Sequence, residues 1–467
     1  MGPVGERSKP MGMKFPFTAT DKGMYVLDGI FNATFHCILE IQGSIQMPLL
    51  AKAIDYALAK TPILKSIARL RGITSYWEVI GDLSPYTILT VKDVSQEWAG
   101  AEKTKELVHQ YLNEPLDITR EPPARFLLIR TSADRCIFIN KVHHCALDGK
   151  AAFHLIRDIQ DAYEKLLRDD PLPALAEMRD RGRWLLVKSV PLSLWVWLLS
   201  EAMMEWVRHE REERRVCYPQ FSASQPLSDT ISYRSLRLAG EDYQQFLSRC
   251  RSLGVTFNDL VITSVCRAIH RWNQSQGTTG GIYSFIMPID LRKYVERNGQ
   301  VPRIMSNYVG GSLITIPAAV VTTVTEMAEH VARNTRFIRN RHIALRQQLR
   351  LPLLSFLPPR WLRERMKRFY QRDPGRFVPT AVVSNFGKLD SILSTFAHCH
   401  ITGIDIILAA VYSGSFLLAL SSYQEVCHLT FTYLQSVCSE PEIDEFLQLV
   451  SYEMLPDREG GSQWGVR

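Results

Sequence analysis

Apolar and polar residues alternate along several stretches of the chain, which predicts strands, and elsewhere apolar residues recur at helical spacing. Strands are expected at 35–41, 125–129, 136–142 and 283–287, with a hairpin-like region at 76–88 and strand-rich sequence at 381–433. Helices are expected at about 50–58 and at 258–272. The pattern therefore predicts a mixed α/β (α+β) protein.

The strand predicted at 136–142 leads into a loop with the sequence His143-His144-Cys145-Ala146-Leu147-Asp148-Gly149. After this loop, apolar side chains recur at three- and four-residue steps up to Leu166, which is typical of one face of an amphipathic helix. Asp148 then takes the N-cap position of the helix. The two histidines are thus expected in a short loop between a strand and a helix.

A chain of 467 residues is usually too long for a single core. Between 168 and 224 the sequence changes from charged and proline-containing, through a bulky apolar run, to almost all charge. We therefore expect an N-terminal half at 15–180, a crossover linker at 181–225 and a C-terminal half at 226–455.

The net charge of +7 is modest for this length, which argues against a dedicated nucleic-acid-binding protein. The basic residues gather locally between 341 and 376, a patch that suits phosphate, a membrane surface or an acidic protein. Nine scattered cysteines without a CxxC pair favour neither a disulfide framework nor a zinc site. The N-terminus lacks an apolar signal segment, so we expect a cytoplasmic protein. We also expect no resident metal or cofactor.

The double histidine suggests general base catalysis, because a loop between a strand and a helix can hold an imidazole in one orientation. By spacing alone, Asp148 is poorly placed as a partner in a catalytic triad, but it can cap the helix and pair with a distant arginine. Gly149 allows close approach of backbone and substrate. Two satisfied polar side chains at the end of a strand remain the alternative interpretation.

The loop matches the pattern HHxxxDG through His143, His144, Asp148 and Gly149, and so resembles the condensation-domain, wax ester synthase and alcohol acetyltransferase superfamily. Further segments resemble shared segments of that superfamily in the same order: Glu114-Pro115-Leu116-Asp117, Thr256-Phe257-Asn258-Asp259, Met287-Pro288-Ile289-Asp290-Leu291-Arg292, Ser306-Asn307-Tyr308-Val309-Gly310 and Val383-Ser384-Asn385-Phe386-Gly387.

The resemblance implies two chloramphenicol-acetyltransferase-like subdomains arranged as a V, with a tunnel between them. It implies that His144 deprotonates an acceptor hydroxyl or amine as this attacks a thioester carbonyl. His143 and Asp148 would be structural, with Arg292 as the partner of Asp148. The candidates for substrate or oxyanion contact are the Gly149 amide and the side chains of Ser384, Asn385, Asn258 and Asn307.

Several alternatives stay open at this point. The plant signature DFGWG is absent, and Pro123-Ala124-Arg125 replaces the corresponding wax ester synthase segment. The acyl donor is a thioester of CoA or of a carrier protein, and a binding module that has lost catalysis is a third possibility. We expect a monomer, with peripheral membrane contact through the apolar and basic segments 184–207 and 349–369.

Overall fold

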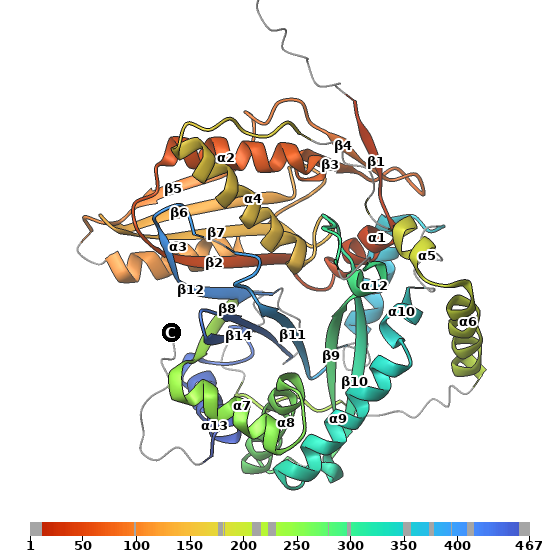
Figure 1. Cartoon of the computed structure of the whole chain (residues 1–467). Helices are drawn as coiled ribbons and strands as arrows, with labels where there is room; N and C mark the ends of the chain where they lie inside the picture. The colour runs from red at the N-terminus through yellow and green to blue at the C-terminus, as the bar shows by residue number, and fades with distance from the viewer. Residues whose placement is uncertain are drawn as a thin grey trace, which may run out of the picture.

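The structure is a computed structural model, and it describes residues 12–97, 100–175, 181, 183–207, 216–222, 230–278, 280–296, 300–348, 356–372, 378–393, 395–408 and 415–456. Two layered halves lie one above the other in Figure 1. Each half is a sheet with helices packed on it, which is the mixed α/β architecture that the alternation pattern predicts.

The sheet of the first half has the strand order β12-β2-β7-β6-β5. Its strands are β2 (Thr34–Gln42), β5 (Leu89–Asp93), β6 (Ala124–Ser132), β7 (Arg135–His143) and β12 (His400–Ile407). Its helices are α2 (Met47–Lys60), α3 (Gly100–Asn113) and α4 (Gly149–Leu167). Alternate residues of β2 serve two cores: Phe35, Cys37 and Leu39 pack with α2 and α4, whereas Ile38 packs with α3.

A small sheet with the order β1-β4-β3 borders this half. It consists of β1 (Lys14–Pro16), β3 (Ser66–Arg69) and β4 (Tyr76–Val79), and α1 (Ala19–Leu27) follows β1. The prediction of a hairpin-like region at 76–88 is wrong, because the strands in this region do not pair with each other. β4 pairs with β3, which precedes it, and the next strand, β5, pairs in parallel with β6 in the larger sheet.

The sheet of the second half has the order β10-β9-β11-β13-β14-β8. Its strands are β8 (Ile231–Leu238), β9 (Ile282–Asp290), β10 (Val309–Pro317), β11 (Ala381–Lys388), β13 (Phe416–Tyr423) and β14 (Val426–Leu434). Its helices are α7 (Gly240–Ser252), α8 (Phe257–Ser275), α9 (Val324–Asn340) and α13 (Glu440–Met454). The core of this half lies between the sheet and α8 and α13.

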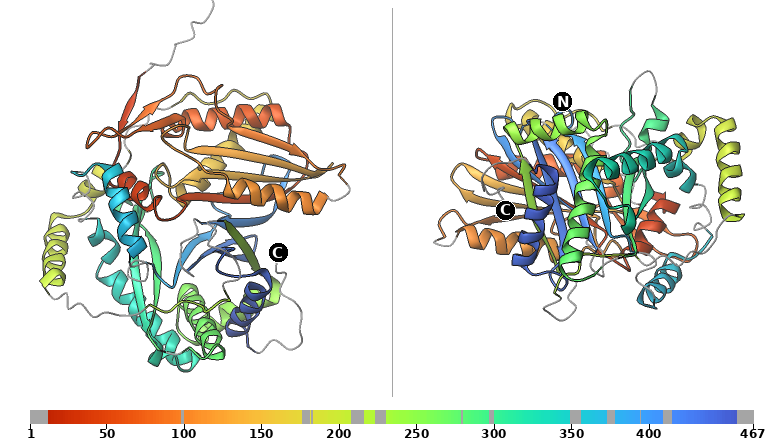
Figure 2. Two further views of the ribbon diagram at one scale, coloured as in Figure 1. Left: turned by 180° about the vertical axis from the view of Figure 1, so that it is seen from behind. Right: turned by 90° about the horizontal axis from the view of Figure 1, so that it is seen from below.

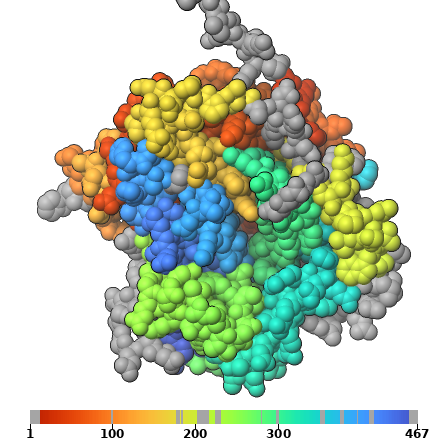
Figure 3. Space-filling model, in the orientation of Figure 1, coloured from red at the N-terminus to blue at the C-terminus, as the bar shows by residue number. Residues whose placement is uncertain are grey.

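One strand crosses between the halves. β12 comes after β11 in sequence, yet it pairs antiparallel with β2 at the edge of the first sheet. In Figure 3 the corresponding blue segment lies where the two halves meet. The domain boundaries expected at 180 and 226 stay a prediction. The hydrogen bonds between β12 and β2 show that the first sheet includes a strand from the C-terminal part of the chain.

The segment between the halves contains α5 (Arg183–Ser189) and α6 (Leu192–Val207), and the second half adds α10 (Ile343–Gln347) and α12 (Pro359–Arg372). All four elements lie toward the same end of the molecule, on the right in Figure 1 and on the left in the rear view of Figure 2. No helix in the described part of the chain is long and apolar enough to cross a bilayer.

Candidate active site

The double histidine lies at the end of β7, where two backbone hydrogen bonds hold it. The His143 amide donates to the Pro123 carbonyl at 2.9 Å, and the His144 amide donates to the Ala33 carbonyl at 2.8 Å. Neighbouring side chains of a strand point to opposite faces. The two imidazoles therefore have different surroundings despite being adjacent.

His143 is buried and held from both sides. Its Nδ1 accepts a hydrogen bond from the Cys145 amide at 3.1 Å, and its Nε2 lies 3.3 Å from Oδ1 of Asp28. Arg363 of α12 also contacts Asp28, with Nη2 and Oδ2 3.1 Å apart. Burial acts to raise the pKa of Asp28, but His143 and Arg363 outweigh it, so this pKa lies below its ordinary value. These contacts assign His143 a supporting position. The sequence analysis did not mark Asp28, and it marked Arg363 only as part of the basic patch at 341–376.

His144 is arranged to be a neutral imidazole. Burial lowers its pKa to about 4, although the nearby charge of Asp148 acts in the opposite direction. Its Nδ1 is buried and has no hydrogen-bond partner among the described residues. The ring of Phe35 meets the imidazole edge-on, with the ring centres 6.4 Å apart. At neutral pH the imidazole is therefore unprotonated and able to accept a proton.

Asp148 begins α4 and joins it to the second half. Its Oδ1 accepts from the Ala151 amide at 2.9 Å, which is the N-cap that the sequence predicts. Arg292 donates two hydrogen bonds to this carboxylate, from Nη1 to Oδ2 at 2.8 Å and from Nη2 to Oδ1 at 3.1 Å. The Tyr308 amide also donates to Oδ2, at 2.7 Å. The aspartate thus caps the helix and pairs with the predicted arginine.

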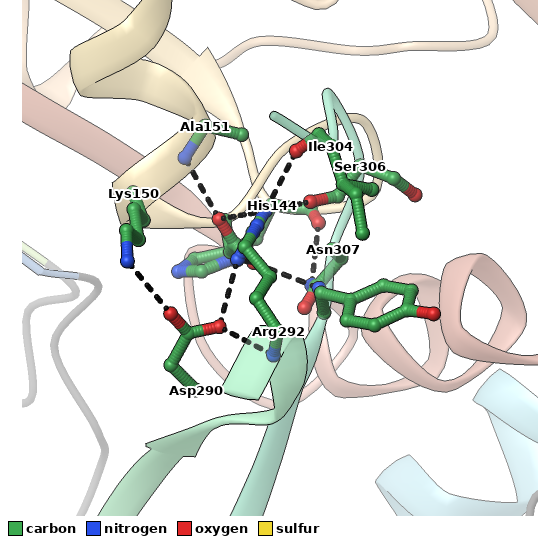
Figure 4. Close-up of polar contacts among 10 residues, drawn as sticks. His144, Lys150, Ala151, Asp290, Arg292, Ile304, Ser306 and Asn307 are labelled. Atoms are coloured by element: carbon green, nitrogen blue, oxygen red, sulfur yellow. Dashed lines mark hydrogen bonds and ion pairs between the residues drawn. The ribbon is translucent and has the colours of Figure 1, made fainter. Parts of the chain in front are cut away.

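The guanidinium of Arg292 is fully buried and bonded on several sides, as Figure 4 shows. Besides Asp148 it donates to Oδ1 of Asp290 at 3.1 Å and to the carbonyls of Ile304 and Ser306 at 2.8 Å and 2.9 Å. β9 ends at Asp290, whose carboxylate also accepts the Arg292 amide and so starts the next turn. This turn directs Arg292 toward the motif.

Two further hydrogen bonds connect the motif to the second half. Nδ2 of Asn307 donates to the His144 carbonyl at 3.0 Å, while its Oδ1 is buried without a hydrogen bond to any described residue. Nζ of Lys150 donates to Asp290 at 3.0 Å. Of the four side-chain candidates for substrate or oxyanion contact, Asn307 is the one that the structure places in contact with the motif.

Gly149 is packed against aromatic rings from both halves. A Cβ at this position would lie 2.2 Å from Cε1 of Phe386 and 3.1 Å from Phe35. Phe386 comes from β11, and its ring centre lies 5.8 Å from that of Phe35 and 5.5 Å from that of Phe153. The need for glycine here therefore comes from packing across the two halves. The sequence analysis named Phe386 only as part of a shared segment, and it did not mark Phe35 or Phe153 as site residues.

The other three side-chain candidates lie apart from the motif's hydrogen bonds. Nδ2 of Asn385 donates to Oδ1 of Asn258, and Oδ1 of Asn385 accepts the Gly387 amide at 2.6 Å. Ser384 is buried one residue earlier on β11. Within the described part of the chain, no hydrogen bond joins these residues to His144 or Asp148, so their contact with substrate stays a prediction.

A cavity of about 10 Å³ lies beside the Arg292 turn and is lined in part by Arg181, Ser306 and Asn307. This volume accommodates about one water molecule. The tunnel between the halves stays a prediction. Among the described residues, no group of three His, Cys, Asp or Glu side chains is arranged to hold a metal ion.

Comparisons with known proteins agree with the architecture. A family model described as Condensation domain matches residues 13–180. A linear gramicidin synthase protein of Brevibacillus parabrevis is 23% identical over 252 residues, which is 51% of this chain and 3% of that protein. The chain thus spans a small part of the length of this relative.

Two solved structures share the fold over nearly the whole chain. The first condensation domain of the CDA synthetase has a TM-score of 0.67 and 15% identity, covering 95% of this chain and 96% of that one. A mutant starter condensation domain of rhizomide synthetase, in complex with C8-CoA and Leu-SNAC, has a TM-score of 0.64 and 11% identity, covering 94% of each chain. The family model supports the resemblance to condensation domains over residues 13–180. The two solved structures show that the chain shares the two-subdomain fold.

Proposed function

We propose that this chain is an acyltransferase that moves an acyl group from a pantetheine thioester to a hydroxyl or amine acceptor, with His144 as the general base. The observation that carries the proposal is the position of His144, whose partly buried imidazole lies in a loop held by the Ala33 carbonyl of the first half and by Asn307 of the second. Burial also lowers the pKa of this imidazole, to about 4. Condensation domains act on thioester-bound substrates, which supports the reaction class.

In the proposed reaction, the acceptor oxygen or nitrogen attacks the thioester carbonyl while its proton passes to the imidazole. The tetrahedral intermediate then collapses, the carbon–sulfur bond breaks and the thiolate takes up the proton. No acyl group is attached to the protein. A pKa near 4 makes His144 a weak base in the empty site, but the developing oxyanion would stabilise the imidazolium and raise this pKa during the reaction. The Gly149 amide and Ser384 are the proposed donors to the oxyanion.

Acyl-CoA is the preferred donor in this proposal, because the similar rhizomide synthetase domain is described with C8-CoA bound. The alternative is a carrier-protein thioester, because condensation domains also act on substrates bound to carrier proteins. Purified protein should be incubated with an acyl-CoA and, separately, with the same acyl group on a carrier, each with a panel of hydroxyl and amine acceptors. Turnover with the carrier and inertness with every CoA donor would select the alternative.

His144→Ala tests the role of the base. We expect a loss of about 10²- to 10⁴-fold in kcat, which is typical for removal of a general base. The melting temperature should change little, because Nδ1 of His144 makes no hydrogen bond to any described residue. His400→Ala, on the exposed side of β12, is the matched control and should retain full activity.

A non-catalytic binding module is the competing function of another class. If His144→Ala leaves the cellular product unchanged while deletion of the protein abolishes it, the catalytic proposal is wrong and the binding module is correct.

A further inference from the structure

Over residues 192–200, whose side chains the structure describes, helix α6 is apolar on two opposite sides. On its inner side Leu198 is fully buried, and the ring of Trp197 lies 6.3 Å from that of His342, with the guanidinium of Arg341 over it at 5.9 Å. These contacts hold α6 against α10 and the turn between α9 and α10. In Figure 3 the yellow segment that contains α6 stands out at the side of the molecule.

The outer side of α6 carries a row of exposed aliphatic side chains. Leu192, Val196 and Leu199 are 78%, 59% and 51% exposed, and their spacing places them along one line of the helix. No charged residue occurs between 192 and 200. A helix that is apolar on the side facing away from its own core normally meets another apolar phase there.

Helix α12 combines exposed aromatic residues with a strong positive charge. Its sequence contains six basic residues and one acidic residue. Met366 packs against the core of the first half, and Tyr370 is buried in it. The opposite line of the helix carries Trp361, Arg365, Arg368 and Arg372, all exposed.

Aromatic and basic side chains on α12 contact one another at the surface. The guanidinium of Arg365 lies over the ring of Trp361 at 5.5 Å. Trp361 is 51% exposed, Phe369 is 41% exposed, and Phe356, just before the helix, is 71% exposed. Exposed aromatic residues beside Arg and Lys are typical of helices that lie in the interface of a bilayer.

The two helices are at the same end of the molecule. Figure 1 and both views of Figure 2 place α6 and α12 toward one side, away from the strands β5 and β6 at the opposite end. An apolar row on one helix and an aromatic, cationic face on the other can therefore meet the same large surface. The side chains at 184 and at 201–207, and residues 349–355, which belong to the predicted contact segments, lie outside the described residues.

We propose that this end of the protein binds peripherally to an anionic membrane surface. Arg365, Arg368 and Arg372 would contact lipid phosphates and carboxylates, while Trp361, Phe356 and the outer row of α6 enter the interfacial region. An acidic protein would satisfy the arginines but would leave the solvent-facing row Leu192, Val196 and Leu199 without a matching partner. Charge complementarity together with this apolar row favours the bilayer over the acidic protein.

The inference does not depend on acyl transfer, so a binding assay tests it separately. Full-length protein is mixed with vesicles of phosphatidylcholine alone and with vesicles that contain about one-third phosphatidylserine, and the bound fraction is measured by flotation. We expect binding to the anionic vesicles only, weakened by raised salt. Replacing Arg365, Arg368 and Arg372 by Gln should weaken binding roughly a hundredfold, because each cation near the surface contributes about a factor of five to six to the affinity.

Two variants complete the test. Lys92 of β5, Lys105 of α3 and Arg135 of β7 are exposed at the opposite end of the molecule, and changing all three to Gln removes the same charge there and should leave vesicle binding unchanged. Leu192, Val196 and Leu199 changed to Ser should weaken binding without altering its salt dependence. Three results would overturn the inference: absence of binding to anionic vesicles, an equal loss of binding in the charge control at the opposite end, or binding to an acidic carrier protein in place of vesicles.

Discussion

Asp148→Ala should destabilise the protein more than any other single change in the motif loop. The carboxylate accepts four hydrogen bonds, one from the Ala151 amide, one from the Tyr308 amide and two from Arg292. Both members of the ion pair are almost inaccessible to solvent, with Arg292 0% and Asp148 1% exposed. Removal of the carboxylate therefore leaves a cation buried without its main partner.

The magnitude follows from these contacts. Removing one partner of a buried ion pair costs about 3–5 kcal/mol, and losing a helix N-cap costs about 1 kcal/mol. Arg292 keeps Asp290 and the carbonyls of Ile304 and Ser306, so the lower end of the first range applies. We expect a loss of about 4 kcal/mol in the free energy of unfolding.

Thermal melting measures this loss. With an unfolding entropy of about 2.1 cal/mol/K per residue, the whole chain melting as one unit would lose about 4 °C, and halves melting separately would lose about twice as much. Asp148→Asn, which keeps an acceptor for the Ala151 amide, should fall between Asp148→Ala and the wild type. Asp290→Asn is the control: this carboxylate is 35% exposed, and its change should cost about 1 °C. Equal shifts for Asp148→Ala and Asp290→Asn would refute the reasoning.

Three further predictions concern the same site. Gly149→Ala should lower the free energy of unfolding by about 1–3 kcal/mol, because the added methyl group overpacks against Phe386. Phe386→Ala should relieve this cost in the double variant. Additive losses of stability in thermal melts would contradict the packing explanation. Because burial lowers the pKa of His144 to about 4, kcat/KM should stay level from pH 8 to about pH 5 and fall only as the imidazole becomes protonated below that. An inflection near pH 6.5 would show that the base is not an imidazole with this lowered pKa. Asn307→Ala should lower kcat about tenfold through loss of its hydrogen bond to the His144 carbonyl, with a melting shift near 1 °C; an unchanged kcat would remove Asn307 from the positioning contacts.

Local sequence determined the setting of the motif. Alternation in β7, the N-cap residue Asp148 and the apolar spacing of α4 all act over a few residues, so strand, loop and helix are visible in the pattern. The capping box of α8, in which Thr256 and Asp259 bond reciprocally, is local in the same way. Such features depend on backbone hydrogen bonds between near neighbours, which residue type and spacing predict.

Contacts between distant segments were decided by tertiary structure. Asp28 reaches His143, and Arg363 reaches Asp28, across 115 and 335 positions of the chain, and no periodicity relates such residues. β12 joins the first sheet although its sequence neighbours belong to the second, because an apolar strand can pair with any sheet edge that its side chains fit. The pairing near β4 was mispredicted for the same reason.

The sequence by itself determined which residues form the double-histidine loop and, through the resemblance, that Arg292 is the partner of Asp148. Only the tertiary structure decided the state of His144, because the pKa of its imidazole falls through burial in the folded chain. It also decided that Gly149 is confined by Phe386 and that Asn385 bonds to Asn258 and not to the motif. Burial and packing sum contributions from the whole chain, whereas capping and alternation are properties of a few adjacent residues.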